Sequence, residues 1–339
     1  MNAIKAEPKI MLSKHTVKKS VKITNPEEPG NKKAVPSKPF RTLPISTQTV
    51  MAYANCRFNI VNIFDQLPIE DIGDTNIKKI TGEHGKIYQL KRAGQVRGAP
   101  TKKGHFRNQI TAYIYILDKM ITVKIFPTGK FHLTGCKNLK HQQQAVVELM
   151  NHIRLIHTES EPTYELDDDQ PLNVILEVVM VNVDFHLGFD VDQKKLDQLL
   201  QCENNDFYTI YETPVNTSVN IKLDYPDPDE KRFQHIIIKG STEKPRVTFT
   251  TTTECPKARI NKTRTHTFLV FSSSKVIQSG RYYDSEMEPA YQKFHDFIIQ
   301  HRKHIELQLQ EQRFDMTQLK GLCAPLQIKV TKNQKIHLG

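Results

Sequence analysis

The stretch VKIFPTGKFHLTG (Val123–Gly135) is matched later in the chain by FLVFSSSKVIQSG (Phe268–Gly280). The two stretches share residue types at corresponding positions: Phe126 and Phe271, Lys130 and Lys275, Thr134 and Ser279, Gly135 and Gly280. Each stretch has the pattern of a strand, a tight turn and a second strand, and each is followed by a segment with helical spacing. A hairpin and helix used twice in one chain predict an internal duplication.

Composition bounds the kind of protein that this sequence encodes. A chain of 339 residues, 38% hydrophobic and 25% charged, is typical of a globular protein with two or three structural units. No apolar run approaches the roughly 20 residues of a membrane span, and the N-terminus lacks the apolar core of a secretory signal. The five cysteines are scattered and never form a CxxC pair. They indicate a reducing intracellular compartment and argue against a zinc site or a disulfide framework.

The net charge of +11 is concentrated in two segments. Met1–Arg41 holds ten Lys or Arg against three Glu, and Lys86–Arg107 holds seven Lys or Arg and no acidic residue. Charge gathered in this way is typical of a surface that binds a polyanion. Solvated tail and loop charges are the alternative interpretation.

The first half has a tail and one set of elements. Residues 1–41 are predicted to be a disordered basic tail, and residues 42–158 form the first repeat. The repeat begins with a strand-like segment from Ile45, followed by a short helix-like segment at Leu67–Gly73. Ile110–Leu117 alternates as a strand does, and Asn138–Ile156 has the spacing of an amphipathic helix.

The second half repeats this order with one insertion. An acidic linker (159–171) precedes the second repeat (172–306), and residues 307–339 form a C-terminal extension. The repeat contains a capped helix after Asp190 or Asp192, an alternating strand at Val215–Leu223 and a final helix at Ser285–Glu306. Residues 224–264 are an insertion with two strand-like pieces of its own.

Alternation in the first hairpin predicts one covered and one open sheet face. Val123, Ile125, Phe131 and Leu133 point toward the helix, whereas Lys124, Phe126, His132 and Thr134 point the other way. An antiparallel sheet can leave one face open, so the second set is available for a ligand.

The two hairpins resemble the hallmark of the TATA-box-binding protein family: a strand ending in Phe, a Ser/Gly turn, Lys, and a strand ending in Thr-Gly. The divergence is similar to that of the TATA-binding-like proteins of large cytoplasmic DNA viruses. The resemblance covers about Ile45–Glu306. It implies an α+β fold in which two direct repeats form a saddle-shaped, curved antiparallel sheet with helices on the convex face.

The same resemblance implies a transcription initiation factor that binds double-stranded DNA in the minor groove and recruits RNA polymerase or general transcription factors. The protein would be located at a viral replication site in the cytoplasm, or in the nucleus. No catalytic activity, cofactor, metal, membrane or small-molecule substrate is expected. The resemblance places DNA contacts at Phe126, Phe271, Thr134, Ser279, His132, Ile277, Tyr113, Tyr115, Lys222, Lys124, Thr49 and Met51.

Several positions depart from the family pattern. Gln109 and Asn216 stand where a second Phe is expected, although Phe106 is close enough in sequence to replace the first. The central Asn pair aligns with Thr49 and Leu176, and Lys124 replaces an apolar groove contact. Strict preference for a TATA sequence is therefore not expected.

Two other classes of function remain at this stage. The first is a protein-interaction scaffold on the same fold, which the missing Phe and Asn residues favour. The second is a nucleic-acid enzyme that carries this fold as an accessory. The absence of a catalytic carboxylate pair, phosphate loop or nucleophile motif weighs against the enzyme.

Overall fold

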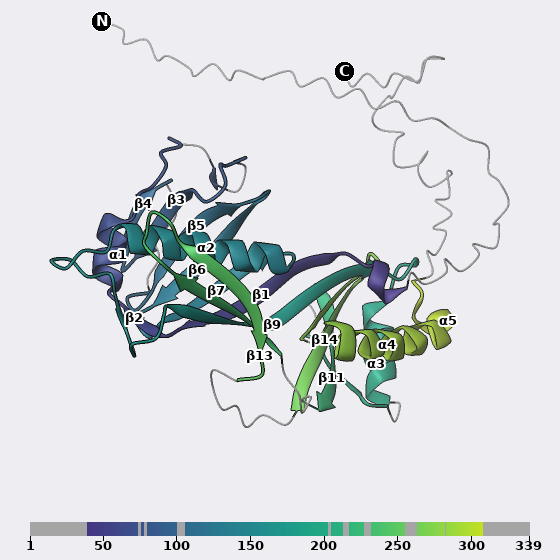
Figure 1. Ribbon diagram of the computed structural model, residues 1–339. Helices are drawn as coiled ribbons and strands as arrows, with labels where there is room; N and C mark the ends of the chain where they lie inside the picture. Colours follow the sequence, from purple (N-terminus) through teal and green to yellow (C-terminus); the bar gives the residue numbers. More distant parts are fainter. Residues whose placement is uncertain are drawn as a thin grey trace, which may run out of the picture. The chain divides into compact units, whose positions relative to one another are not determined.

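The computed structural model describes residues 39–307, except 74–75, 78–79, 100–105, 203–204, 213–216, 227–231, 255–262 and 282 (Figure 1). The predicted disordered tail, up to residue 38, and the predicted C-terminal extension, from residue 308, lie outside the described residues, as does Asn216. None of the helices in the described ranges has both the length and the apolar character needed to cross a membrane.

A single antiparallel sheet of 13 strands organises the described chain. Its main path runs β10-β11-β14-β15-β9-β1-β7-β6-β5-β3-β4. The first-half strands are β1 (Ile45–Ala54), β3 (Ile87–Arg92), β4 (Gln95–Gly98), β5 (Ile110–Ile116), β6 (Lys119–Phe126) and β7 (Lys130–Cys136). The second-half strands are β9 (Asn173–His186), β10 (Phe207–Ile210), β11 (Ser218–Pro226), β14 (Thr263–Phe271) and β15 (Lys275–Gly280). A large antiparallel sheet with a few helices confirms the predicted α+β class.

The strand order is similar on both sides of the central β1–β9 pair. Outward from β1 come β7, β6, β5, β3 and β4, and outward from β9 come β15, β14, β11 and β10. In each half the central strand comes first in the sequence, and the hairpin that lies next to it comes last among the strands. The two hairpins with matching sequences, β6–β7 and β14–β15, therefore occupy corresponding places.

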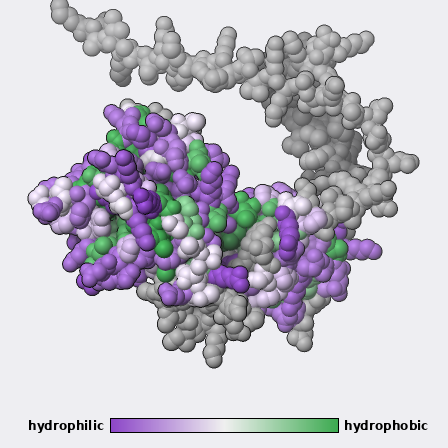
Figure 2. Space-filling model, in the orientation of Figure 1, coloured by the Kyte–Doolittle hydropathy of each residue, from purple (hydrophilic) through white to green (hydrophobic). Residues whose placement is uncertain are grey.

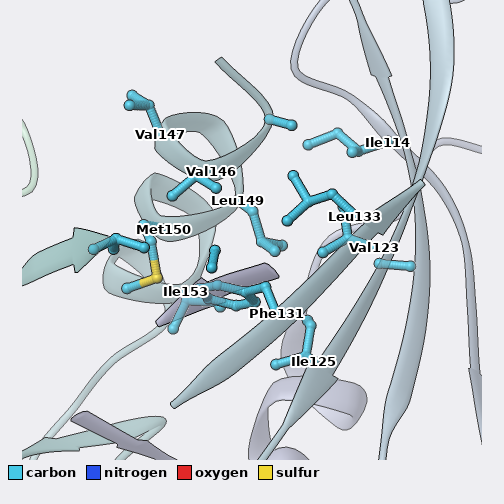
Figure 3. Packing of buried hydrophobic residues seen from close by; sticks show 14 of the residues in the cluster. Ile114, Val123, Ile125, Phe131, Leu133, Val146, Val147, Leu149, Met150 and Ile153 are labelled. Carbon is cyan, nitrogen blue, oxygen red and sulfur yellow. The ribbon is translucent and has the colours of Figure 1, made fainter. Parts of the chain in front are cut away.

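The helices cover the apolar side of the sheet. In the first half, α2 (Leu139–Leu155) follows the hairpin, and Asn138 caps it by accepting a hydrogen bond from the His141 N–H at 2.9 Å. Figure 3 shows its apolar side chains packed on those of β5, β6 and β7. The residues labelled in Figure 3 are all buried: Ile114, Val123, Ile125, Phe131, Leu133, Val146, Val147, Leu149, Met150 and Ile153.

The second half has a core of its own, built with more aromatic residues. Its helices are α3 (Gln193–Cys202), α4 (Glu288–Gln300) and α5 (Arg302–Ile305), and the π-helix η3 (Tyr283–Met287) leads into α4. Phe268 of β14 stacks on Phe294 of α4 with ring centroids 4.2 Å apart. Asp192, one of the two predicted caps, accepts a hydrogen bond from the Lys195 N–H at the start of α3.

Three predicted boundaries differ from the structure. The first short helix is α1 (Ile60–Gln66), capped by Asn59, and Leu67–Gly73 is not helical because Pro68 disfavours a helical Leu67. The folded region begins before residue 42: Phe40–Thr42 is a 3-10 helix (η1), and Phe40 is buried against Tyr291. The linker contains β8 (Tyr164–Leu166), which pairs with β2 (Cys56–Phe58).

The insertion of the second half packs into the core of the first half. Its strands β12 (Phe233–Lys239) and β13 (Arg246–Thr252) form a hairpin, and β12 pairs with the first four residues of β9. Ile236 and Ile238 of β12 belong to the same buried cluster as the first-half hairpin. The insertion is therefore part of the first core.

Candidate nucleic-acid interface

The open face of the sheet carries the side chains that point away from the helices. In β6, Val123 and Ile125 are fully buried, while Lys124 and Phe126 between and after them are partly exposed. The same alternation in β14 buries Phe268 and Val270 and leaves Leu269 and Phe271 partly exposed. The predicted division of the hairpin residues between two faces is confirmed for the first hairpin, and the second hairpin shows the same division. On the face of the molecule visible in Figure 2, hydrophobic residues form only small, separate areas.

Phe126 and Phe271 occupy matching positions on this face. Phe126 ends β6 and lies opposite Lys130 at the start of β7. Phe271 ends β14, and the next strand likewise begins with a lysine, Lys275. Both rings are partly exposed, so both are accessible to a ligand that covers the face.

A row of hydroxyl and amide side chains crosses the face between the two phenylalanines. In the first half, Thr122 lies opposite Thr134, and Thr134 lies opposite Thr49 of the central strand. In the second half, Thr267 lies opposite Ser279, and Ser279 lies opposite Asn182 of β9. Short hydroxyl and amide groups can hydrogen-bond to base edges without the bulk of a long charged side chain.

Asn182 was missed by sequence alignment and is the counterpart of Thr49. Because Ser279 corresponds to Thr134, the residues opposite them correspond as well. The predicted counterpart, Leu176, instead lies on the covered side and is 2% exposed. The Oδ1 atom of Asn182 is buried and has no hydrogen-bond partner among the described residues.

Three lysines of the open face lie near aromatic rings. The Nζ atoms of Lys91, Lys124 and Lys222 are 5.1, 6.0 and 5.9 Å from the ring centroids of Tyr113, Phe106 and Tyr208, respectively. Phe106 is the most exposed of these rings, at 70%. Cation–π contacts hold the ammonium groups over the sheet, where they are available to phosphate oxygens.

His132 and Ile277 complete the middle of the face. His132 lies opposite both Lys124 and Met51, and Ile277 lies opposite Leu269 and Asp184. Partial burial, and then the charge of Lys124, lower the pKa of His132 below its ordinary value. The His132 side chain is therefore neutral near pH 7 and presents one N–H donor and one acceptor nitrogen.

Two of the predicted contact residues offer little surface. Tyr115 is 6% exposed because the segment around Gly82 covers its ring, and a Cβ atom built on Gly82 would lie 2.7 Å from it. Thr49 is 8% exposed between its two neighbouring strands. The structure thus places Tyr115 outside the accessible face and leaves Thr49 in its centre as a small, recessed group. Met51 lies beside it and is partly exposed.

A buried ion pair lies where β9 changes neighbours. β12 pairs with β9 up to Leu176, and β15 pairs with it from Val181 onward. Arg281 fills the gap: its guanidinium is paired with Glu177 and donates to the carbonyl oxygen of Val178 at 3.1 Å. Tyr53 of β1 donates to the same carboxylate at 3.1 Å. A cavity of about 310 Å³ adjoins this pair, and Gln142 of α2 also lines it.

The described part of the chain has no group of three or more His, Cys, Asp or Glu residues arranged to hold a metal ion. Its candidate site is an extended sheet surface with two phenylalanines, a polar row and lysines. The arrangement suits the binding of a long anionic ligand.

Comparisons with known proteins give distant similarities. No family model matches the chain. The sequence is 22% identical over 221 residues to the "Uncharacterized protein 335L" of Invertebrate iridescent virus 6, which is 60% of this chain and 63% of that protein. The chain thus matches less than two thirds of that relative. Among solved structures, it is similar to the TBP of Methanococcus jannaschii, with a TM-score of 0.40 and 11% identity, over 76% of this chain and 98% of that one.

Proposed function

We propose that this protein binds double-stranded DNA through the open face of its sheet and acts as a transcription initiation factor like the TATA-box-binding proteins. In this proposal the two halves are direct repeats of one unit, and the sheet is curved over the DNA. The minor groove is the site that fits, because its base edges present few hydrogen-bonding groups and match a face of apolar and hydroxyl side chains. The protein would work in a reducing intracellular compartment and recruit polymerase or other factors through its helices.

The observation that carries the proposal is the matched placement of Phe126 and Phe271. Each ends the corresponding strand of its half, lies on the open face and is followed by a tight turn and a lysine. Apolar side chains inserted between base steps at two places kink DNA, and the cost of unstacking is a few kcal/mol per step. The lysines that flank the face add contacts to phosphate, which strengthen binding without reading sequence.

A DNA-bending experiment tests the proposal directly. The full chain is titrated into A·T-rich and G·C-rich duplexes labelled at both ends, and energy transfer between the labels reports bending. The test variant combines Phe126→Ala with Phe271→Ala. The control is Leu155→Ala, which removes an exposed apolar side chain from α2 on the helix side.

We expect bending that favours the A·T-rich duplex, is lost in the double variant and persists in the control. Binding without bending, equal for all three proteins and strongly weakened by salt, would contradict the wedge mechanism. That result would support the second candidate, a scaffold for protein partners. The departures at Gln109 and Lys124 favour this candidate, since both put polar groups where apolar contacts are expected.

A further inference from the structure

The strand β13 has a free edge. It pairs with β12 along all seven of its residues, and within the described ranges no strand pairs with its other side. Figure 1 shows this hairpin extending the sheet next to β9. The outer edge therefore carries backbone N–H and C=O groups that another strand can bind.

The sequence of β13 favours pairing. RVTFTTT is rich in β-branched residues, and Val247–Thr253 contains no charge, proline or glycine. Natural edge strands are commonly protected by lysine, proline, a bulge or a short length. Most of the β13 side chains are exposed, and Phe249 is 43% exposed. Such an edge is a candidate interface.

We propose that β13 pairs antiparallel with β13 of a second copy of this chain, forming a two-fold symmetric dimer. Charge complementarity identifies the occupant. Arg246 begins the strand, and Glu254 lies two residues beyond its end. Within the described part, neither has a salt-bridge partner. An antiparallel register centred on Thr250 places Arg246 of each copy beside Glu254 of the other, so the two-fold axis generates two attractive pairs.

The same register uses the exposed aromatic residue. Phe249 lies opposite Ile236 of β12 and therefore points to the helix side of the sheet. In the dimer each Phe249 lies opposite Thr251 of the other copy and diagonal to the other Phe249, within reach of an aromatic ring. The interface is separate from the open face, so this inference does not depend on the proposed function.

Charge reversal tests the pairing. The mass of the full chain is measured by sedimentation at several concentrations near physiological salt, where the Debye length of about 8 Å limits general repulsion between two basic molecules. We expect a concentration-dependent dimer. Arg246→Glu alone, or Glu254→Arg alone, replaces two attractive pairs by two repulsive ones and raises the dissociation constant about tenfold.

A mixture of the two single variants is the strongest test of the proposed charge pairs. One variant then carries acids at both positions and the other carries bases, so the mixture is expected to associate at least as well as the unchanged chain. Arg246→Glu combined with Glu254→Arg restores the homodimer. Lys194→Glu on α3 serves as the control for a change in net charge. A monomer at every concentration, or single variants and the mixture that associate equally, would overturn the proposal.

Discussion

Asn182 holds on β9 the position that Thr49 holds on β1. Each lies opposite the hydroxyl residue of the neighbouring hairpin strand, Ser279 for Asn182 and Thr134 for Thr49. The two central strands thus present one amide and one hydroxyl in equivalent places. The two halves of the face thus have equivalent positions that carry different side chains.

Replacement of Asn182 is expected to weaken DNA binding. Its side chain is partly exposed on the open face, and losing one hydrogen bond between its amide and a ligand costs about 1 kcal/mol, or roughly fivefold in affinity. Asn182→Ala is compared with Asn182→Thr, which copies the first half and should lose less. Asn151→Ala, on α2, is the control. Equal dissociation constants for all variants would exclude a role for the amide.

Lys124 is expected to contact phosphate. Lys124→Gln removes one charge next to Phe106, so the slope of log affinity against log salt should become shallower by about one unit. The loss should be similar on A·T-rich and G·C-rich duplexes, because phosphate contacts carry no sequence information. Lys194→Gln, on the helix side, should leave the slope unchanged. An unaltered slope for Lys124→Gln would place this lysine outside the interface.

Removing one partner of the buried ion pair between Arg281 and Glu177 is expected to destabilise the fold. Both side chains are about 95% buried, so Arg281→Met leaves a buried carboxylate without its guanidinium and should lower the free energy of unfolding by about 3–5 kcal/mol. Combining it with Glu177→Gln removes the charge and should recover part of the loss. Urea unfolding followed by circular dichroism measures both. No recovery in the double variant would indicate that packing, not charge, dominates.

Acid is expected to destabilise the second half through His266. Burial lowers the pKa of this side chain to about 4, although Glu286 lies 3.4 Å away and the Tyr225 ring packs against it. The unfolded chain takes up a proton near pH 6.5, while the folded chain does not until about pH 4. Stability is therefore full above pH 6.5 and falls by up to about 3 kcal/mol as the pH decreases to 4. His266→Phe should show a shallower decline in the free energy of unfolding over this window. If the free energy of unfolding declined identically in both proteins, other titrating groups would be responsible for the decline.

Local patterns predicted most of the elements. The hairpin Val123–Gly135 and the helix beginning at Leu139 follow from alternation and helical spacing over short segments, and both are present. The first short helix precedes its predicted position, because a proline such as Pro68 can stand either at the first turn of a helix or just after its end. Burial of Tyr115 depends on a covering loop, which alternation within one strand does not show.

Long-range pairing could not be predicted. Alignment with the family pattern places the central pair at Thr49 and Leu176, whereas strand pairing makes Asn182 the counterpart of Thr49. The β1–β9 register also shifts between Thr49 and Val50. Such a shift depends on the contacts of both strands and leaves no local signal. The pairing of β12 with β9 likewise joins segments that are far apart in the sequence.

The pairing of β12 with β9 has a consequence for synthesis on the ribosome. Chains fold from the N-terminus as they emerge, and the first half would be ready to collapse once α2 has been made. Its core nevertheless lacks Ile236 and Ile238, which are translated only with β12, after β9, α3, β10 and β11. The nascent protein therefore passes through a stage in which part of this apolar core is exposed to solvent.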